Sequence, residues 1–271
     1  MINKTAIIIV SHNNKAITTK LCNQIQKYTK TEYDLLVVET GSKPNEIVTD
    51  YPALIAPDGI RMTNGFNLGI FYMKQREKIF NIHYNNFWIC VNDTLHYDID
   101  TLSPMVKFMN NNSDCGEIHP FIENSPSPYL HKKLDGKKAR AESFCEIVCP
   151  LLSRKAIDLD LLDSRFYYGW GIDYSLTKTL YDNNLKIYVS NEVGVKHDAG
   201  TTTKTGKDSS FKTLANQFDV SRENMLKGLI EKYGEKWYKV IYDSIPNAVS
   251  KDSYAYWLCD VGCNAKKEDL I

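Results

Sequence analysis

The sequence predicts an α/β fold in which a mostly parallel sheet is flanked by helices and followed by a small helical C-terminal extension. Short apolar runs at residues 6–10, 33–40 and 87–91 are typical of strands that are covered on both faces. Between the first two runs, apolar residues are spaced along one helical face, which predicts a right-handed strand–helix–strand unit with parallel pairing. The chain of 271 residues, 43% of them apolar or aromatic, is long enough to bury a large core.

The other elements of residues 1–200 are predicted from the same two periodicities. They are a strand at 53–56, a helix from 64 to 80, a helix beginning near 101, a strand at 144–153, a helix at 172–184, and strands at 185–190 and 193–200. A strand at 115–123 is expected at a sheet edge, because Pro120 cannot donate a ladder hydrogen bond. Residues 124–143 are polar and rich in Pro, Gly and Lys, which predicts a long mobile loop.

A change of composition near residue 200 predicts two domains, at 1–200 and 201–271. Residues 201–210 have no apolar anchor and are expected to be a linker. A helical stripe near residues 225–233 follows, and then a segment rich in Trp and Tyr. These aromatic residues either pack the tail against the sheet or form an acceptor, dimer or membrane-surface contact.

Charge and cysteine content narrow the partners and the compartment. Lys+Arg and Asp+Glu both number 33, so no global basic field favours nucleic acid, and no nucleic-acid partner is expected. Seven scattered cysteines fit no zinc pattern, Cys22 and Cys90 are expected to be buried, and reduced thiols predict a cytoplasmic protein. No apolar run approaches the ~18 residues of a membrane span, so no transmembrane segment is expected. The run of five at 6–10 predicts a strand and not a signal peptide.

Polar side chains follow three of the predicted strands. Ligands bind beyond the carboxyl ends of the strands in open α/β sheets, so these residues are candidates for a binding site. Each alone is also explained as a turn or a helix cap. The candidates are Ser11, His12 and Asn13 after the first strand, Glu39, Gly41 and Ser42 after the second, and Asn92, Asp93 and Thr94 after the fourth.

Asp93 is the sharpest candidate among them. Magnesium and manganese take oxygen ligands and are usually held by one or two carboxylates together with substrate phosphates. A carboxylate at a strand end has the reach for this, which predicts that Asp93 holds a metal ion bound to a diphosphate. The alternative is that Asp93 caps the turn before Leu102.

Several segments occur in the order and spacing found in one enzyme family. They are IIIVSHNN, LLVVETGS, NGFNLGI, WICVNDT, EIVCPLLSRKAIDLDLLDSRFYYGWGIDYSL and VGVKHDAG. In these segments the chain resembles family 2-like glycosyltransferases of the GT-A fold, which is Rossmann-like, over about residues 5–200. The resemblance does not extend to residues 205–271.

The resemblance implies roles for individual residues in binding a nucleotide sugar. The residues that it assigns to the donor are Ser11, His12 and Asn13 in a nucleotide-contacting loop, Glu39 at the base with Ser42 close by, and Gly65, Asn67 and Gly69 along the nucleotide-sugar pocket. Asp93 matches the final acid of the metal-binding DxD motif, and Val91 replaces its first acid, so Asn92 and Thr94 become possible helpers.

The resemblance also implies a second metal ligand and a catalytic base. His197 resembles a late histidine that returns to the metal, although a lone histidine in such a strand is more often a satisfied core residue. Asp173 lies near the position of the catalytic base, and the Glu-Asp pair found there in relatives is Trp170-Gly171 here. Asp173 is either this base or a helix cap. Trp170, between two glycines, either belongs to the core or presents its ring to a sugar.

The implied activity is that of a glycosyltransferase of the hexosyltransferase type that depends on Mn2+ or Mg2+. It would move a sugar from a UDP- or GDP-linked donor to a hydroxyl of a glycan, a lipid-linked or a protein acceptor, with inversion as the simplest mechanism and a homodimer as a possible assembly. Residues 124–143 would act as an acceptor lid. One alternative is a catalytically weakened binding module of the same fold. A nucleotidyltransferase is less favoured, because residues 11–15 contain no glycine for a phosphate loop.

Overall fold

A computed structural model describes residues 2–96, 99–125, 127, 129, 136–160, 162–198, 204, 211–262 and 270. The predicted linker at 201–210, apart from Lys204, lies outside the described residues, and so does the centre of the predicted loop at 124–143. No helix in the described part of the chain is long and apolar enough to cross a membrane.

The described residues form a mixed α/β structure around one nine-stranded sheet with the order β3-β2-β1-β4-β8-β6-β9-β5, in which β7 also pairs with β9. The strands are β1 (Ile2–Ser11), β2 (Tyr33–Thr40), β3 (Ala53–Ala56), β4 (Ile82–Val91), β5 (Thr94–His96), β6 (Cys115–Ile122), β7 (Ala139–Glu142), β8 (Leu151–Ser153) and β9 (Lys186–His197). The helices are α1 (Lys15–Tyr28), η1 (Pro44–Glu46), α2 (Met62–Phe80), α3 (Leu102–Asn111), α4 (Arg154–Ile157), α5 (Ile172–Asp182), α7 (Leu214–Tyr233), α8 (Trp237–Ser244), α9 (Asp252–Tyr256) and η2 (Trp257–Gly262).

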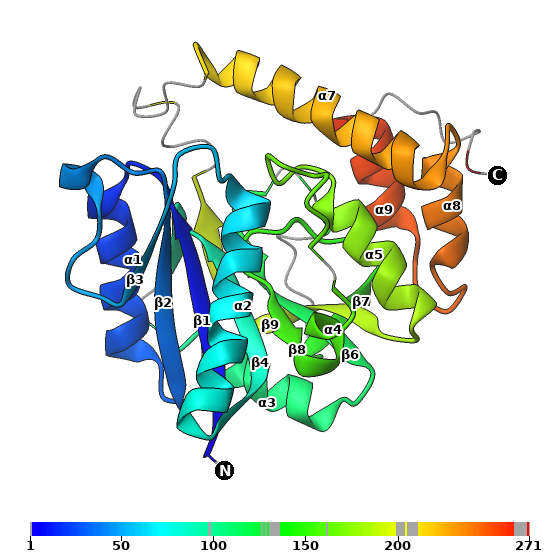
Figure 1. The fold of residues 1–271 in the computed structure, drawn as a ribbon. Helices are drawn as coiled ribbons and strands as arrows, with labels where there is room; N and C mark the ends of the chain where they lie inside the picture. Colours follow the sequence, from blue (N-terminus) through cyan, green and yellow to red (C-terminus); the bar gives the residue numbers. More distant parts are fainter. Residues whose placement is uncertain are drawn as a thin grey trace.

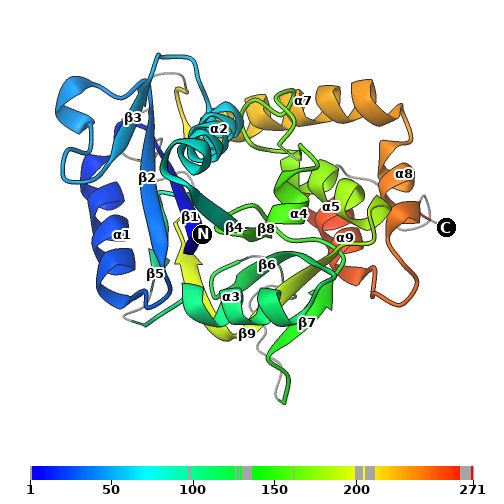
Figure 2. The ribbon, with the colours of Figure 1, turned by 60° about the horizontal axis from the view of Figure 1, so that its bottom comes forward.

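The half of the sheet formed by β3, β2, β1 and β4 is parallel throughout, as predicted. α1 and α2 lie on opposite sides of this half (Figure 2). The register pairs Ser11 with Glu39 and Val10 with Val91, so β1, β2 and β4 end at the same edge. The polar residues that follow these strands therefore meet at one place.

The other half of the sheet differs from the prediction for β6. This strand was expected at an edge, but it lies inside the sheet, antiparallel to β8 and parallel to β9. The register with β9 shifts between His119 and Phe121, at Pro120. The irregularity accommodates the residue that lacks a backbone donor, so the edge position is not needed.

Three further boundaries were predicted wrongly. Of residues 144–153, only β8 is a strand, and 144–150 are irregular although largely buried. The two strands expected at 185–190 and 193–200 are one long strand, β9. Part of the expected loop, at 139–142, is β7, which pairs with β9.

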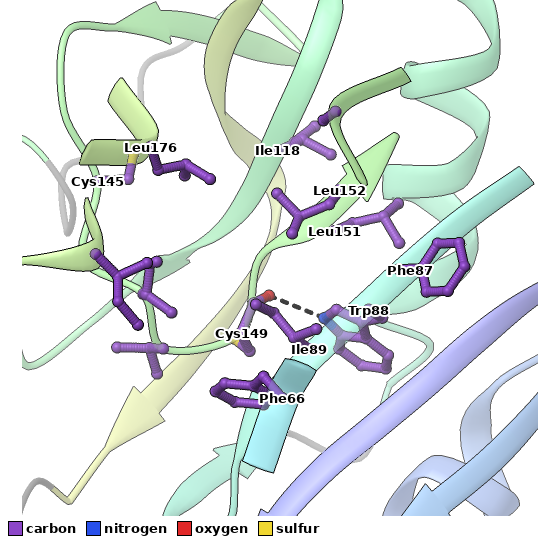
Figure 3. Packing of buried hydrophobic residues seen from close by; sticks show 14 of the residues in the cluster. Phe66, Phe87, Trp88, Ile89, Ile118, Cys145, Cys149, Leu151, Leu152 and Leu176 are labelled. Atoms are coloured by element: carbon purple, nitrogen blue, oxygen red, sulfur yellow. Dashed lines mark hydrogen bonds between the residues drawn. The ribbon is translucent and has the colours of Figure 1, made fainter. Parts of the chain in front are cut away.

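The core lies between the sheet and its helices. Trp88 donates its indole N–H to the carbonyl oxygen of Cys149 over 2.8 Å, which satisfies the one polar group of this buried ring (Figure 3). Cys22 and Cys90 are fully buried, as predicted. Burial raises the pKa of the Cys90 thiol, so this thiol stays protonated and acts as a small apolar residue.

The C-terminal helices lie against the rest of the chain. α7 runs across the end of the molecule at which β1 and β2 end (Figure 1). The ring of Tyr174 in α5 lies 5.3 Å from that of Trp237 and 5.9 Å from that of Tyr254, both of which are buried. These aromatic residues therefore pack the tail against the helix α5, whereas packing against the sheet itself was one of the two expectations.

Candidate active site

A cavity of about 580 Å3 lies at the edge where β1 and β4 end. It brings together Trp170 and six of the candidate donor, metal and base residues, which are Ser11, His12, Asn92, Asp93, Asp173 and His197. It is also lined by Phe144, by residues 146–148 and by side chains of α7. Segments that are far apart in the sequence thus share one concave site.

The strand ends at the cavity are joined by hydrogen bonds. The hydroxyl of Thr18 in α1 donates to Ser11 Oγ over 3.0 Å and accepts from Asn92 Nδ2 over 3.1 Å, which connects β1 to the residue after β4. Nδ1 of His12 lies 2.6 Å from the carbonyl oxygen of Thr40, which can only accept. Nδ1 of His12 therefore carries a proton, and its ring is held in one orientation.

Asn13, Glu39 and Ser42 do not line the cavity but form a hydrogen-bonded group next to His12. Ser42 donates its hydroxyl to the fully buried Glu39 carboxylate over 2.6 Å, and the backbone N–H of Val48 donates to the same carboxylate over 2.9 Å. The backbone N–H of Asn13 donates to Ser42 Oγ over 2.9 Å. The network shapes the loops after β1 and β2, and contact with a base stays a prediction for Glu39.

Gly65, Asn67 and Gly69 of α2 pack against neighbouring parts of the chain, and none of them lines the cavity. A Cβ at Gly69 would lie 2.5 Å from Ile8 Cγ2, and one at Gly65 would lie 2.9 Å from Thr40 Cγ2. These two glycines let α2 approach the sheet closely. Asn67 donates its amide to the carbonyl oxygen of Leu162 over 2.7 Å.

Asp93 and His197 face each other in the cavity. β5 pairs with β9 so that Thr94 is opposite His197, and this register places His197 Nε2 3.3 Å from Asp93 Oδ1. Asn124 fixes the histidine backbone, because it donates to the carbonyl oxygen of His197 over 2.6 Å and accepts from its N–H over 2.8 Å. Burial opposes the charged imidazole, but the hydrogen bond and the charge of Asp93 outweigh it and raise the pKa of His197.

The Asp93–His197 pair fits a divalent ion. Two adjacent ligands that each lie about 2.1 Å from an octahedral ion are about 3.0 Å apart. The observed separation of 3.3 Å is close to this value, and the donors are one carboxylate oxygen and one imidazole nitrogen. Among the described residues, no three or more His, Cys, Asp or Glu side chains are placed to hold one metal ion. The remaining ligands would therefore be phosphate and water.

Asp173 lies in the first turn of α5 and faces the same cavity. Burial and the negative charge of Glu146 raise the pKa of Asp173 to about 7. The carboxylate of Glu146 accepts a hydrogen bond from Ser125 Oγ over 3.1 Å, and burial raises the pKa of Glu146 as well. Two buried carboxylates therefore share this part of the site, and the charge of Glu146 acts on Asp173.

Glu146 and Arg61 were not predicted from the sequence. Glu146 lies in the irregular segment that was interpreted as a strand, where an isolated charge carries no signature. Arg61 immediately precedes α2, and its guanidinium lies 5.8 Å from each of the rings of Tyr168 and Phe211. Of the described residues that line the cavity, Arg61 alone is a Lys or Arg. Its place just before a helix, beyond a strand end, was the available signal.

Comparison with known proteins identifies the fold. No family model and no curated protein matches the sequence. Among solved structures, GalNAc-T7 crystallised with UDP, GalNAc and Mn2+ superimposes with a TM-score of 0.65 at 9% identity, over 95% of this chain and 56% of that one. The chain has the GT-A fold.

TarS of S. aureus, a second GT-A structure, has a TM-score of 0.59 at 9% identity, over 98% of this chain and 46% of that one. Its residues 1–349 in complex with UDP-GlcNAc give 0.57 at 10% identity, over 98% and 78% of the two chains. The chain thus spans about half the length of GalNAc-T7 and of the longer TarS structure. The fold implied by the resemblance is confirmed, and membership of family 2 stays a prediction.

Proposed function

We propose that the protein is a metal-dependent glycosyltransferase that moves a sugar from a nucleoside-diphosphate sugar to an acceptor hydroxyl with inversion. The observation that carries this proposal is that one cavity of a GT-A fold holds both the Asp93–His197 pair and Asp173, whose pKa is about 7. UDP is the favoured nucleotide, because the solved structures with a similar fold were crystallised with UDP or UDP-GlcNAc.

In this proposal, the strand-end side of the cavity binds the donor. Ser11, His12 and Asn92 would contact the nucleotide, and Arg61 would donate hydrogen bonds to the diphosphate. Asp93 and His197 would hold Mn2+ or Mg2+, which, when bound, stabilises the negative charge that develops on the departing diphosphate.

Asp173 would act as the base. The acceptor hydroxyl must lose a proton as it attacks the sugar, and a carboxylate within hydrogen-bond reach can take it. An ordinary aspartate is a weak base, whereas burial and Glu146 give Asp173 a pKa near neutral pH. This raised pKa favours an enzyme over a binding module.

Thermal melting with nucleotides tests the donor site. UDP at about one hundred times its Kd should stabilise the native protein by about 2.7 kcal/mol in the presence of Mn2+. That corresponds to a rise in Tm of roughly 5–10 °C for a chain of this size. Asp93→Asn and His197→Ala should lose the Mn2+-dependent part of the rise, and Asp182→Asn, an exposed aspartate at the end of α5, should keep it. A rise that both site variants retain would refute the metal assignment.

Turnover separates the enzyme from the weakened binding module. Asp173→Asn should keep the nucleotide-induced rise in Tm and lose transfer and hydrolysis of UDP- and GDP-sugars. A native protein that binds nucleotide but turns over none of these donors would instead be the binding module. This alternative is tested because Val91 and Trp170-Gly171 stand where the resemblance implies acidic residues.

A further inference from the structure

The side of the cavity that α7 lines differs chemically from the strand-end side. Gln217, Phe218, Ser221 and Met225 of α7 line it, together with Trp170 from the loop before α5. The rings of Trp170 and Phe218 are 5.4 Å apart and inclined by 37°. None of these side chains has a role in the donor site proposed above.

Phe218 is exposed beside a partly buried Trp170, unlike Trp237 and Tyr254 of the C-terminal segment. Phe218 is 40% exposed, whereas Trp237 and Tyr254 are 3% and 0% exposed. Trp170 stands between Gly169 and Gly171, whose φ angles of +95° and +94° are unfavourable for other residues. A pair of rings in the wall of a cavity, one exposed and one partly buried, is a platform for a ligand with an apolar face.

Two polar atoms of residues that line the same cavity have no partner in the described part of the chain. They are Oε1 of Gln217, which can only accept, and the indole N–H of Trp257, which can only donate. Trp257 is 93% buried, and both residues line the cavity. Buried polar groups normally have partners, so a ligand in the cavity that supplies hydroxyl groups would satisfy these two atoms.

α7 is held firmly enough to form a fixed wall. Met225 and Leu229 are buried against the rest of the chain. Nζ of Lys232 lies 2.8 Å from Asp163 Oδ2 and donates to Ser175 Oγ over 2.8 Å. These contacts hold the second half of the helix, while its first half presents Gln217 and Phe218 to the cavity.

We infer that this wall is an acceptor subsite for a saccharide, so that the protein elongates a glycan. A pyranose combines apolar C–H faces, which suit the Trp170–Phe218 pair, with hydroxyls that both accept and donate, which suit Gln217 and Trp257. The inference rests on the proposed function. The hydroxyl oxygen of the acceptor forms a bond to the anomeric carbon, and its proton passes to Asp173. The bond from that carbon to the phosphate oxygen breaks, and its electron pair leaves with the nucleoside diphosphate.

Saturation-transfer NMR tests the subsite without knowledge of the natural acceptor. The probes are the methyl glycosides of glucose, galactose, mannose, N-acetylglucosamine and N-acetylgalactosamine, added to the native protein with UDP and Mn2+. At least one should receive saturation on its ring protons. Phe218→Ala should reduce that signal about fivefold or more, as expected for the loss of a stacking partner. Phe80→Ala, which removes an exposed ring of α2 outside the cavity, should leave it unchanged.

The outcomes separate this inference from the proposed function. Phe218→Ala should retain the rise in Tm with UDP and Mn2+, which also shows that the variant is folded. If that rise is present but no glycoside receives saturation, or the signal survives in Phe218→Ala, the subsite is refuted and the donor site stands. Saturation of N-acetyltyrosinamide alone would also refute it, in favour of a peptide acceptor. A native protein with no UDP-induced rise would refute the proposed function itself.

Discussion

Replacing Glu146 by glutamine should shift the pH dependence of sugar transfer to lower pH. In the proposed mechanism Asp173 must be ionised to accept the hydroxyl proton, and its pKa is about 7. Its ionised fraction is then about one in eleven at pH 6 and about ten in eleven at pH 8. The rate of the native enzyme should therefore rise about tenfold over this interval.

The substitution removes one of the two causes of the raised pKa. Burial, the larger cause, remains, but the like charge of Glu146 is lost, so the pKa of Asp173 falls while staying above its ordinary range. More of the base is then ionised at pH 6. The ratio of the rates at pH 8 and pH 6 should consequently drop below the native value of about tenfold.

The assay is kcat/KM for release of the nucleoside diphosphate between pH 5.5 and 8.5, with the donor that the melting screen identifies. Glu192→Gln, which removes an exposed carboxylate of β9, should keep the native profile. Asp173→Asn should be slower by about 10²- to 10⁴-fold, without the rise. A native profile with no rise, or a Glu146→Gln midpoint that is unmoved or higher, would refute the role given to these two carboxylates.

Three further substitutions probe the architecture of the site. Asn124→Ala should weaken the binding of Mn2+ in the presence of UDP by about tenfold, measured by titration, because it frees the backbone of His197. Gly171→Ala should lower the free energy of unfolding by about 2–4 kcal/mol in urea, because its φ is +94° and the new Cβ would lie 2.6 Å from Phe166. Lys232→Met should cost about 1 kcal/mol in the same experiment, through the loss of the ion pair that anchors α7.

Each of these variants has a matched control. Asn183→Ala removes a comparable exposed amide contact on α5 and should leave Mn2+ binding unchanged. Gly234→Ala has a similar φ of +83° with nothing within 4 Å, so it should cost only about 1–2 kcal/mol. Lys227→Met removes an exposed lysine of α7 and should have no measurable effect. Equal effects in a variant and its control would contradict the contact assigned to that residue.

The elements predicted correctly were those with a strong local signal. The apolar runs of β1 and β2 and the one-sided stripe of α1 specify strand, helix and strand without reference to the rest of the chain. The strand predicted at residues 144–150 was wrong because a segment can be apolar through burial beside a cavity as well as through strand pairing. Composition does not separate these two causes. The edge position predicted from Pro120 was wrong because a register shift accommodates a proline inside a sheet.

The site was predictable to the extent that parallel strands end at one edge. Asp93 and Asn92 were found in this way, and the resemblance added His197 and Asp173. Glu146 was missed because its significance comes from its effect on Asp173, across an irregular segment. The contribution of α7 was also missed. A helical stripe shows which face of a helix is buried, but not which cavity the other residues of the helix line.

The position of α7 has a consequence for how specificity could diversify. Pockets assembled from one stretch of chain are hard to alter in part, since each change disturbs the whole. Here one side is supplied by the ends of β1 and β4 and another by a helix, α7, that begins more than a hundred residues after β4. Under the proposed function, substitutions at Gln217 or Phe218 would therefore change the choice of acceptor while leaving the proposed donor site intact.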